Sequence, residues 1–320
     1  MYFFPEVAAR TAARAGMRAA LGMIVVEFPS SYAERAGEYL SKGLALRDEY
    51  KGHPLISTIF APHAPYTVSD ESLLSVRRYA DELEVPVHIH LHETAHEVAS
   101  SVEEHGCRPF ERLKSLGLLS PLLMAVHMTQ LEDGEIEEAA ATGLSVVHCP
   151  ESNLKLASGG CRTADLVAAG VNVALGTDGA ASNNDLDMLG EMRTAALLGK
   201  HTAGDAGVLD AATVLRMATI NGARALGMGQ ETGSLVAGKW ADIACVDLGR
   251  LTTLPVYDPV SQLVYAAGRE QVTDVWVAGR HRVVGGRVAG LDEEDLRRRA
   301  AAWQDRIADS DRKHTGEASA

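Results

Sequence analysis

The stretch VPVHIHLHET, residues 85–94, places a histidine at every second position after a Val-Pro-Val run and then adds a glutamate. Alternate residues of a β-strand lie on one face, so His88, His90 and His92 are predicted to point inward while the apolar residues between them pack outward against helices. An ordinary core strand would carry valine or leucine at the histidine positions. The stretch therefore predicts a strand with a polar inner face.

Short apolar runs, the histidine strand among them, alternate with longer amphipathic segments through the first half of the chain. The other runs are MRAALGMIVV (17–26), LISTIFAPH (55–63), LLMAVHM (122–128), LSVVHCP (144–150) and VNVALGTD (171–178). Together they make six β-α steps in a row. Such regular alternation, with strands that read as continuous apolar runs, predicts a parallel sheet covered by helices.

A polar residue stands at the C-terminal side of almost every predicted strand. These residues are His63, His90, His127, His148 and Asp178. A TIM-type barrel assembles its active site from the C-terminal ends of several strands, whereas an open doubly wound sheet concentrates it at one switch point. The pattern therefore favours a barrel.

The second half of the chain has a different pattern. ATVLRMATINGARALG (212–227) predicts one long helix, and residues 233–248 and 272–288 predict short β segments separated by glycine turns. LDEEDLRRRAAAWQDRIADS (291–310) predicts a charged amphipathic helix, and KHTGEASA (313–320) predicts a disordered tail. A small β appendage is expected to follow the barrel.

Composition limits the classes of partner. The 320 residues carry a formal net charge of −13, which argues against binding to a nucleic-acid backbone. The four cysteines form no C-x-x-C pair, and no apolar run approaches the roughly 20 residues that span a bilayer. Neither export nor membrane insertion is predicted, so we expect a cytoplasmic protein with a small-molecule partner.

His90, Glu93 and Asp178 are the first candidates for chemistry. Neutral imidazole is the commonest protein ligand for zinc, and a carboxylate such as Asp178 commonly completes such a site. Glu93 follows His90 by three residues and should sit just past the strand end, where a general acid/base could reach a water molecule activated by the metal.

Other histidines have simpler interpretations. His88 and His92 are predicted to be hydrogen-bonded core residues, and His96 and His105 to be solvated on a helix. His148 is left open between support of the metal ligands and a structural role. A phosphate loop in GTDGAASNN is disfavoured, because no G-x-x-x-x-G-K-[ST] pattern is present.

Seven motifs in register carry a family resemblance. They are APHAPYTVSDESL (61–73), IHLHET (89–94), AVHMTQL (125–131), VVHCPESNLKLASG (146–159), ALGTDGAASNNDLDMLGEMRTAALL (174–198), MATINGARALG (217–227) and GSLVAGKWADI (233–243). In this order and spacing they resemble the amidohydrolase superfamily, and within it the 5′-methylthioadenosine/S-adenosylhomocysteine deaminase branch, which is related to the triazine hydrolases. The resemblance extends from the first residue to about residue 290.

The resemblance implies a (β/α)8 barrel with one divalent metal, usually zinc, although such ligands also suit iron or manganese. His90 and Asp178 are implied as metal ligands. Glu93 would carry a proton from the attacking water to purine N1, and Asp178 would take the remaining proton. His127 would orient the attacking hydroxide and the substrate. His63 would contact the nucleoside, as Glu93 and Asp178 also would.

The sequence departs from the family pattern in one respect. Members open the barrel with an H-x-H pair of metal ligands on the first strand, and no such pair precedes residue 88. We therefore expect the chain to lack strand one, most of strand two and the N-terminal part of the β appendage. Residues 1–228 would then form the barrel with strands three to eight, 229–290 a remnant of a small β-sandwich, and 291–320 a helix and tail.

The implied reaction is hydrolytic deamination of an adenine nucleoside to the inosine analogue and ammonia. The substrate would be 5′-methylthioadenosine, S-adenosylhomocysteine or adenosine, and the resemblance also implies a homo-oligomer. Two alternatives remain open. The chain could be an inactive, truncated remnant that acts as a binding module, or a guanine, cytosine or triazine hydrolase on the same scaffold.

Overall fold

The computed structural model describes residues 2–315, with side chains described as far as residue 312. Residues 316–320, the end of the predicted tail, lie outside the described part. The helices and strands, in chain order, are α1 (Pro5–Ala15), β1 (Ala19–Val25), α2 (Ala36–Glu49), β2 (Ile56–Pro62), η1 (Pro65–Thr67), α3 (Asp70–Leu83), β3 (Val87–Leu91), α4 (Ala95–His105), α5 (Pro109–Ser115), β4 (Leu123–His127), α6 (Asp133–Thr142), β5 (Ser145–His148), α7 (Pro150–Lys155), α8 (Thr163–Ala168), β6 (Asn172–Leu175), α9 (Met188–Ala203), α10 (Ala211–Met217), α11 (Ile220–Ala225), β7 (Ile243–Val246), α12 (Pro259–Tyr265), η2 (Arg269–Gln271), β8 (Val272–Val277), β9 (Arg280–Val284), β10 (Arg287–Val288) and α13 (Glu293–Thr315).

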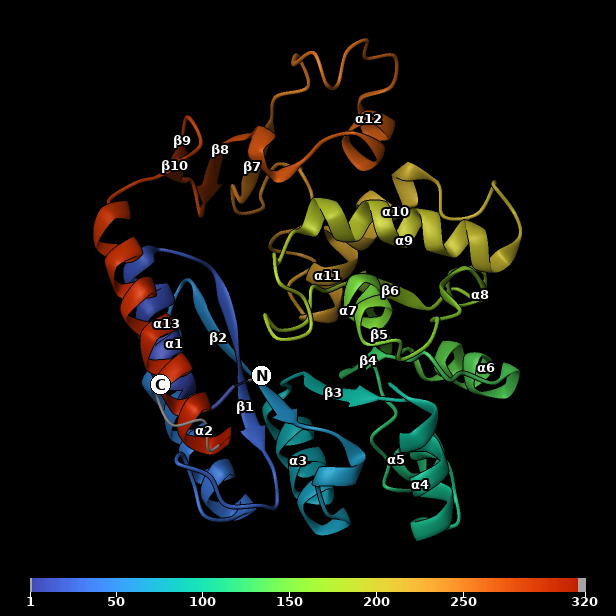
Figure 1. Ribbon diagram of the computed structural model, residues 1–320. Coiled ribbons are helices and arrows are strands. Elements are labelled where there is room, and N and C mark those ends of the chain that lie inside the picture. Colours follow the sequence, from blue (N-terminus) through green and yellow to red (C-terminus); the bar gives the residue numbers. More distant parts are fainter. Residues whose placement is uncertain (1, 316–320) are drawn as a thin grey trace.

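A six-stranded parallel sheet forms the centre of the structure. Its strands pair in sequential order from β1 to β6, and each pair is parallel. Figure 1 shows these strands following one another along a curved sheet, with α3, α4, α5 and α6 outside it. The predicted α/β class, with a parallel sheet covered by helices, is confirmed.

The outward face of β3 is apolar and packs against helices, as predicted. Val87, Ile89 and Leu91 are at most 3% exposed and share one hydrophobic cluster with Leu73 of α3 and Leu113 of α5. Burial of such a side chain stabilises the fold by about 1.5–3 kcal/mol. A slip of β3 by one residue would move its histidines into this apolar layer, so the packing also fixes the register.

The prediction that His92 shares the inner face with His88 and His90 is wrong. Strand β3 ends at Leu91, and His92 has a left-handed backbone with φ 53°. This conformation turns the imidazole away from the inner face, where it is fully buried and its Nε2 accepts a hydrogen bond from the Phe110 backbone amide at 3.1 Å. The interpretation of His92 as a hydrogen-bonded core residue agrees with this position.

The prediction of one long helix over residues 212–227 is also wrong. The helix breaks at Thr219, whose φ of −129° and ψ of −95° are not helical, and α10 and α11 lie on either side. The break brings Asn221 to the edge strand β6. The Asn221 side chain donates to the Val173 carbonyl at 2.9 Å, and the Asn221 carbonyl accepts from the Asn172 side chain at 3.1 Å. Polar groups at this sheet edge thereby gain partners.

A separate four-stranded sheet follows the parallel one. It is antiparallel in the order β10-β9-β8-β7, in agreement with the predicted short β segments. An ion pair between Arg18, just before β1, and Asp242, just before β7, joins it to the main sheet. Helix α13 extends through Thr315, so residues 313–315 of the predicted tail are helical. No helix among the described residues is long and apolar enough to cross a membrane.

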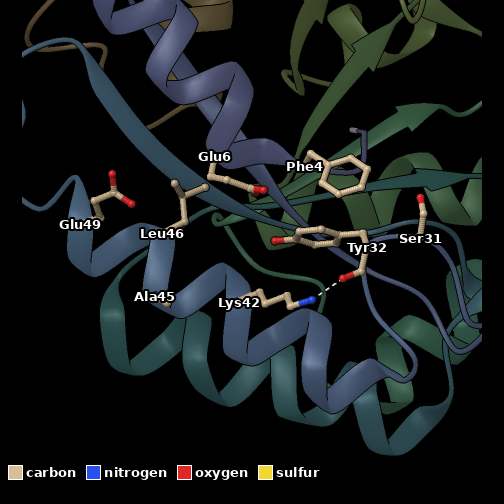
Figure 2. A pocket seen from close by; sticks show the side chains of 8 residues that line it. All are labelled: Phe4, Glu6, Ser31, Tyr32, Lys42, Ala45, Leu46 and Glu49. Carbon is tan, nitrogen blue, oxygen red and sulfur yellow. Dashed lines mark hydrogen bonds between the residues drawn. The ribbon is translucent and has the colours of Figure 1, made fainter.

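A hollow of about 370 Å³ lies between α1 and α2. Figure 2 shows the Tyr32 ring inside it, with Phe4 close by and Glu6 and Leu46 on the helices that flank it. The rings of Phe4 and Tyr32 meet edge to face at 5.3 Å, and the Lys42 amine donates to the Tyr32 carbonyl. The Phe4–Tyr32 contact joins the start of α1 to the loop after β1, and none of the lining residues belongs to the predicted site.

Replacement of Asn221 by alanine should lower the free energy of unfolding by about 1–3 kcal/mol, because the Val173 carbonyl would lose its side-chain donor. Denaturant titration would measure the change. Asn184→Ala, at an exposed asparagine whose side chain accepts only a surface hydrogen bond from Lys155, is the control and should change stability by less than about 0.5 kcal/mol. Equal effects of the two substitutions would contradict the role of Asn221.

Candidate metal centre and active site

Three side chains from the carboxyl ends of different strands meet on the inner side of the sheet. His90 of β3, His127 of β4 and Asp178, which follows β6, place their candidate ligand atoms within 4.8 Å of one another. The His63 ring, at the end of β2, lies 5.2 Å from the His90 ring. The structure therefore brings together residues that are far apart in the sequence, because parallel strands end at the same edge.

The tautomer of His90 is fixed by a backbone carbonyl. His90 Nδ1 lies 2.9 Å from the His63 carbonyl oxygen, which can only accept, so Nδ1 carries the proton and Nε2 keeps a free lone pair. Burial, followed by the neighbouring charges of His88, His127 and His63, lowers the pKa of His90 to about 3. His90 is therefore a neutral imidazole at physiological pH, which is the form that binds a metal.

Asp178 is held as a carboxylate by two hydroxyl groups. Ser152 of α7 and Ser182 both donate to Asp178 Oδ2, at 2.8 Å and 2.5 Å. Burial opposes ionisation, but the hydrogen bonds from Ser182, Ser152 and the Gly179 backbone outweigh it, so the pKa of Asp178 lies below its ordinary value. The group therefore supplies one negative charge to the cluster.

His127 faces both the cluster and Glu93. Its side chain is 1% exposed, and its Nε2 lies 3.8 Å from Glu93 Oε2. On the other side of the ring, Nδ1 lies 3.0 Å from the Asn153 side-chain amide. Burial lowers the pKa of His127, although the charges of Glu93 and Asp178 act in the opposite direction.

The backbone around this cluster is strained. His92, His127, Met128 and Asp178 have φ values between 50° and 77°, in the left-handed region that is sparsely populated by residues other than glycine. Each such residue costs about 1–3 kcal/mol, and the cost is met only where the surroundings fix the conformation. Such strain gathers at functional sites, and here it marks the carboxyl ends of β3, β4 and β6.

Glu97 holds the loop that carries Glu93. Its carboxyl group accepts the backbone N–H groups of His92 and Glu93 at 3.1 Å and 2.7 Å, while Thr94 caps α4 by accepting from the Glu97 backbone. Burial raises the pKa of Glu97 to about 7. The Glu93 side chain lines a hollow of about 440 Å³ together with Tyr66 and Glu97, so a small molecule can reach its carboxylate.

The remaining histidines occupy different positions around the cluster. His63 Nδ1 lies 3.0 Å from Thr67 Oγ1, and burial lowers the pKa of His63. The His88 ring lies 5.9 Å from the His90 ring on the same face of β3. His148 is buried outside the three-residue cluster, and its Nδ1 has no hydrogen-bond partner among the described residues. His96 and His105 are exposed on α4, as predicted.

The three clustered side chains fit a divalent cation. Imidazole and carboxylate groups suit zinc, and His90 Nε2 and ionised Asp178 are in the states that bind metal, with His127 close to both. The His63 carbonyl orients His90, and the Ser152 and Ser182 hydroxyls hold Asp178.

Several supporting residues were missed in the sequence. Ser152 and Asn153 lie in the quoted motif VVHCPESN, and Ser182 lies in GTDGAASNN, so hydroxyl and amide groups directly after strand ends could have indicated them. Glu97 stands three residues after the capping residue Thr94, in the first turn of α4, where an acidic side chain can reach back to backbone N–H groups before the helix. Their partners, however, depend on loops that meet only in the folded chain.

Known proteins share both the sequence and the structure of this chain. A family profile described as "Amidohydrolase family" matches residues 3–282. The 5-methylthioadenosine/S-adenosylhomocysteine deaminase of Teredinibacter turnerae is 51% identical over 307 residues, which cover 96% of this chain and 70% of that protein. A relative with the same name from Saccharophagus degradans is 46% identical over 96% of this chain and 69% of its own length.

Solved structures of related enzymes are also similar to this chain. The crystal structure of an adenosine deaminase from Xanthomonas campestris with bound zinc matches with a TM-score of 0.95 and 54% identity, over 96% of this chain and 70% of that one. An atrazine chlorohydrolase from Arthrobacter aurescens complexed with zinc matches with a TM-score of 0.85 and 26% identity, over 93% and 68% of the two chains. The resemblance predicted from the seven motifs is confirmed.

The buried titratable groups predict how stability depends on pH. Burial is the first cause of every shift in this set. The pKa values are lowered to about 4 for His88 and His92 and about 3 for His90 and His148, and they are raised to about 7 for Glu97 and about 8 for Glu191. Below about pH 6.5 the unfolded chain takes up more protons, because the histidines outnumber the carboxyl groups. Stability should therefore fall as the pH falls from about 6.5 to about 4.5.

Above about pH 6.5 the histidines are largely neutral in both the folded and the unfolded chain. The difference in bound protons then comes mainly from Glu97 and Glu191, whose raised pKa values keep protons on them in the folded protein but not in the unfolded chain. Stability should therefore also fall as the pH rises toward about 8, which gives a maximum near pH 6.5. Denaturant midpoints in the presence of a chelator would show it. A double variant, Glu97→Gln with Glu191→Gln, should lose the alkaline decline, whereas a wild-type stability that keeps rising to pH 8 would contradict these assignments.

Proposed function

Because the chain belongs to the amidohydrolase family, we infer that it is a hydrolase that removes the C6 amino group of an adenine nucleoside. The names of its relatives support 5′-methylthioadenosine, S-adenosylhomocysteine or adenosine as the substrate. The observation that carries the proposal is the cluster of His90, His127 and Asp178 with the Glu93 carboxylate beside it. The products would be the inosine analogue and ammonia.

We propose zinc as the resident metal, with His90 Nε2 and Asp178 as ligands from this chain. When bound, such a cation acts as a Lewis acid that makes water acidic enough to supply the nucleophile near neutral pH. The fixed tautomer of His90 and the low pKa of Asp178 support these two assignments. His127 is placed to orient the attacking oxygen and the substrate rather than to serve as the main ligand, because its Nε2 faces Glu93.

Glu93 and Asp178 would divide the proton transfers. Glu93 takes one proton from the attacking water and delivers it to purine N1, which makes C6 electron-poor while the new C6–O bond forms. Asp178 moves the remaining hydroxyl proton to the amino group, so the C6–N bond breaks and ammonia leaves as the C6 carbonyl forms. His63, at the end of β2, would contact the nucleoside. The reaction consumes one water and leaves N1 protonated.

We also propose that the two sheets are parts of a barrel and a β-sandwich. Strands β1 to β6 would correspond to strands three to eight of a (β/α)8 barrel within residues 1–228, and the antiparallel sheet would be part of a small β-sandwich within residues 229–290. Residues 291–320 would form the terminal helix and tail. Sequential parallel pairing and the separate second sheet support this division.

The unpaired cysteines fit a reducing cytoplasm, and the family resemblance supports a homo-oligomer.

Glu93→Gln should lower kcat by about 10²–10⁴-fold, because the amide cannot carry the proton, and should leave zinc content unchanged. Loss of the adenine absorbance of 5′-methylthioadenosine and metal analysis of the same sample would measure both effects. Glu104→Gln, which lines the same hollow, is the matched control. Wild-type turnover by Glu93→Gln would exclude Glu93 as the proton carrier.

His90→Ala should remove zinc from the purified protein, since it deletes the only cluster nitrogen whose lone pair is fixed by a backbone partner. Metal content after dialysis, measured by mass spectrometry, would give the result. His96→Ala, an exposed histidine on α4, should leave the zinc content unchanged. Full zinc retention by His90→Ala would mean that the metal binds elsewhere.

A further inference from the structure

Glu191 of α9 is a buried carboxyl group for which the proposed reaction has no use. Its side chain is fully buried, and each of its oxygens accepts a hydrogen bond from a different segment. Oε1 accepts from the Asn183 side-chain amide at 2.5 Å, and Oε2 accepts from the Glu151 backbone N–H at 3.2 Å. Glu191 therefore joins α9 to the loop after β6 and to the start of α7.

Both partners of Glu191 are next in sequence to the serines that hold Asp178. Glu151 precedes Ser152, and Asn183 follows Ser182. The two serine hydroxyls donate to the same oxygen of Asp178, at 2.8 Å and 2.5 Å. A shift of the Ser152 segment or the Ser182 segment by even 1 Å would break one of these hydrogen bonds, because hydrogen bonds form only over a narrow range of donor–acceptor distances.

The side-chain orientation of Asn183 is fixed by its own backbone neighbours. Its Oδ1 accepts the backbone N–H groups of Asp185 and Leu186 at 3.3 Å and 3.2 Å, so Nδ2 must face the carboxyl groups. Thr194, also on α9, donates to Glu151 Oε1 at 2.9 Å and adds a second link between α9 and α7. The connection is thus built from oriented groups rather than from a single contact.

Asp178 needs such support because its own backbone is unfavourable. Its φ of 58° lies in the left-handed region, at a cost of about 1–3 kcal/mol. The Thr177 hydroxyl donates to the Asp178 carbonyl at 3.0 Å and supports this backbone locally. The segments that carry Ser152 and Ser182 add support from the side of the carboxylate.

We propose that Glu191 is a positioning residue for Asp178, which it holds by locking the Ser152 and Ser182 segments against α9. This role rests on the proposed function, in which Asp178 binds the metal and transfers a proton. Burial, with the charge of Glu151, raises the pKa of Glu191 to about 8.

Hydrogen exchange of the full-length chain, followed by mass spectrometry without metal, tests the lock. Glu191→Met keeps the side-chain length but loses both acceptors, and should raise exchange of residues 178–187 about tenfold or more, while residues 87–91 stay unchanged. Glu191→Gln keeps one acceptor oxygen and should fall between Met and wild type. Ser101→Ala, which removes a buried hydrogen bond on α4, should leave exchange of 178–187 unchanged. Unchanged exchange in Glu191→Met overturns the proposal.

Zinc affinity, measured by competition with a chelator, gives the second readout. Glu191→Met should weaken zinc binding about tenfold in the wild-type background and add no further loss in a Ser152→Ala, Ser182→Ala background, because the same support would already be gone. Fully additive losses would overturn the proposal. If the wild-type chain binds no zinc, the proposed metal site fails, and the exchange result alone decides the role of Glu191.

Discussion

The hydrogen bond from His90 Nδ1 to the His63 carbonyl is the interaction on which the site depends. A carbonyl oxygen cannot donate, so this bond selects one tautomer and turns Nε2 of His90 toward His127 and Asp178. The bond exists because β2 and β3 are neighbours in a parallel sheet, with His90 also donating its backbone N–H to the same carbonyl. The His63 carbonyl oxygen therefore both pairs the two strands and sets the tautomer of His90.

Burial produces different results for the carboxyl groups around this centre. The pKa of Asp178 is lowered because two hydroxyls and a backbone N–H stabilise its charge, whereas desolvation raises the pKa of Glu97 to about 7 and that of Glu191 to about 8. The buried histidines remain neutral for the same reason of desolvation. Asp178 therefore supplies the negative charge of the cluster, and Glu93 lies nearby in the lining of the hollow.

Periodicity and strand order made much of this structure predictable. The alternation of apolar runs indicated a parallel sheet, and parallel strands bring His90, His127 and Asp178 to one edge wherever they lie in the chain. His92 was misplaced because the strand ends one residue earlier and the backbone then turns left-handed. Residues 212–227 were misread because the helical pattern does not reveal that Asn221 must reach the edge of β6.

The support of the site was harder to predict, since it depends on contacts between distant segments. Glu191 lies forty residues from Glu151, and its place in the first turn of α9 would be explained from sequence by the helix dipole alone. Its importance becomes visible only when α7, α9 and the loop after β6 are seen together. Buried polar groups of this kind are specified by their partners, and a single sequence does not pair them.

A crystal grown with zinc and measured on both sides of the zinc absorption edge would test the assignment of the metal ligands directly. We expect an anomalous peak at bonding distance, about 2.0–2.2 Å, from both His90 Nε2 and a carboxylate oxygen of Asp178. His90 Nδ1 should still be bonded to the His63 carbonyl. A peak elsewhere, or none at these two residues in protein that is saturated with zinc, would contradict the assignment of the metal centre.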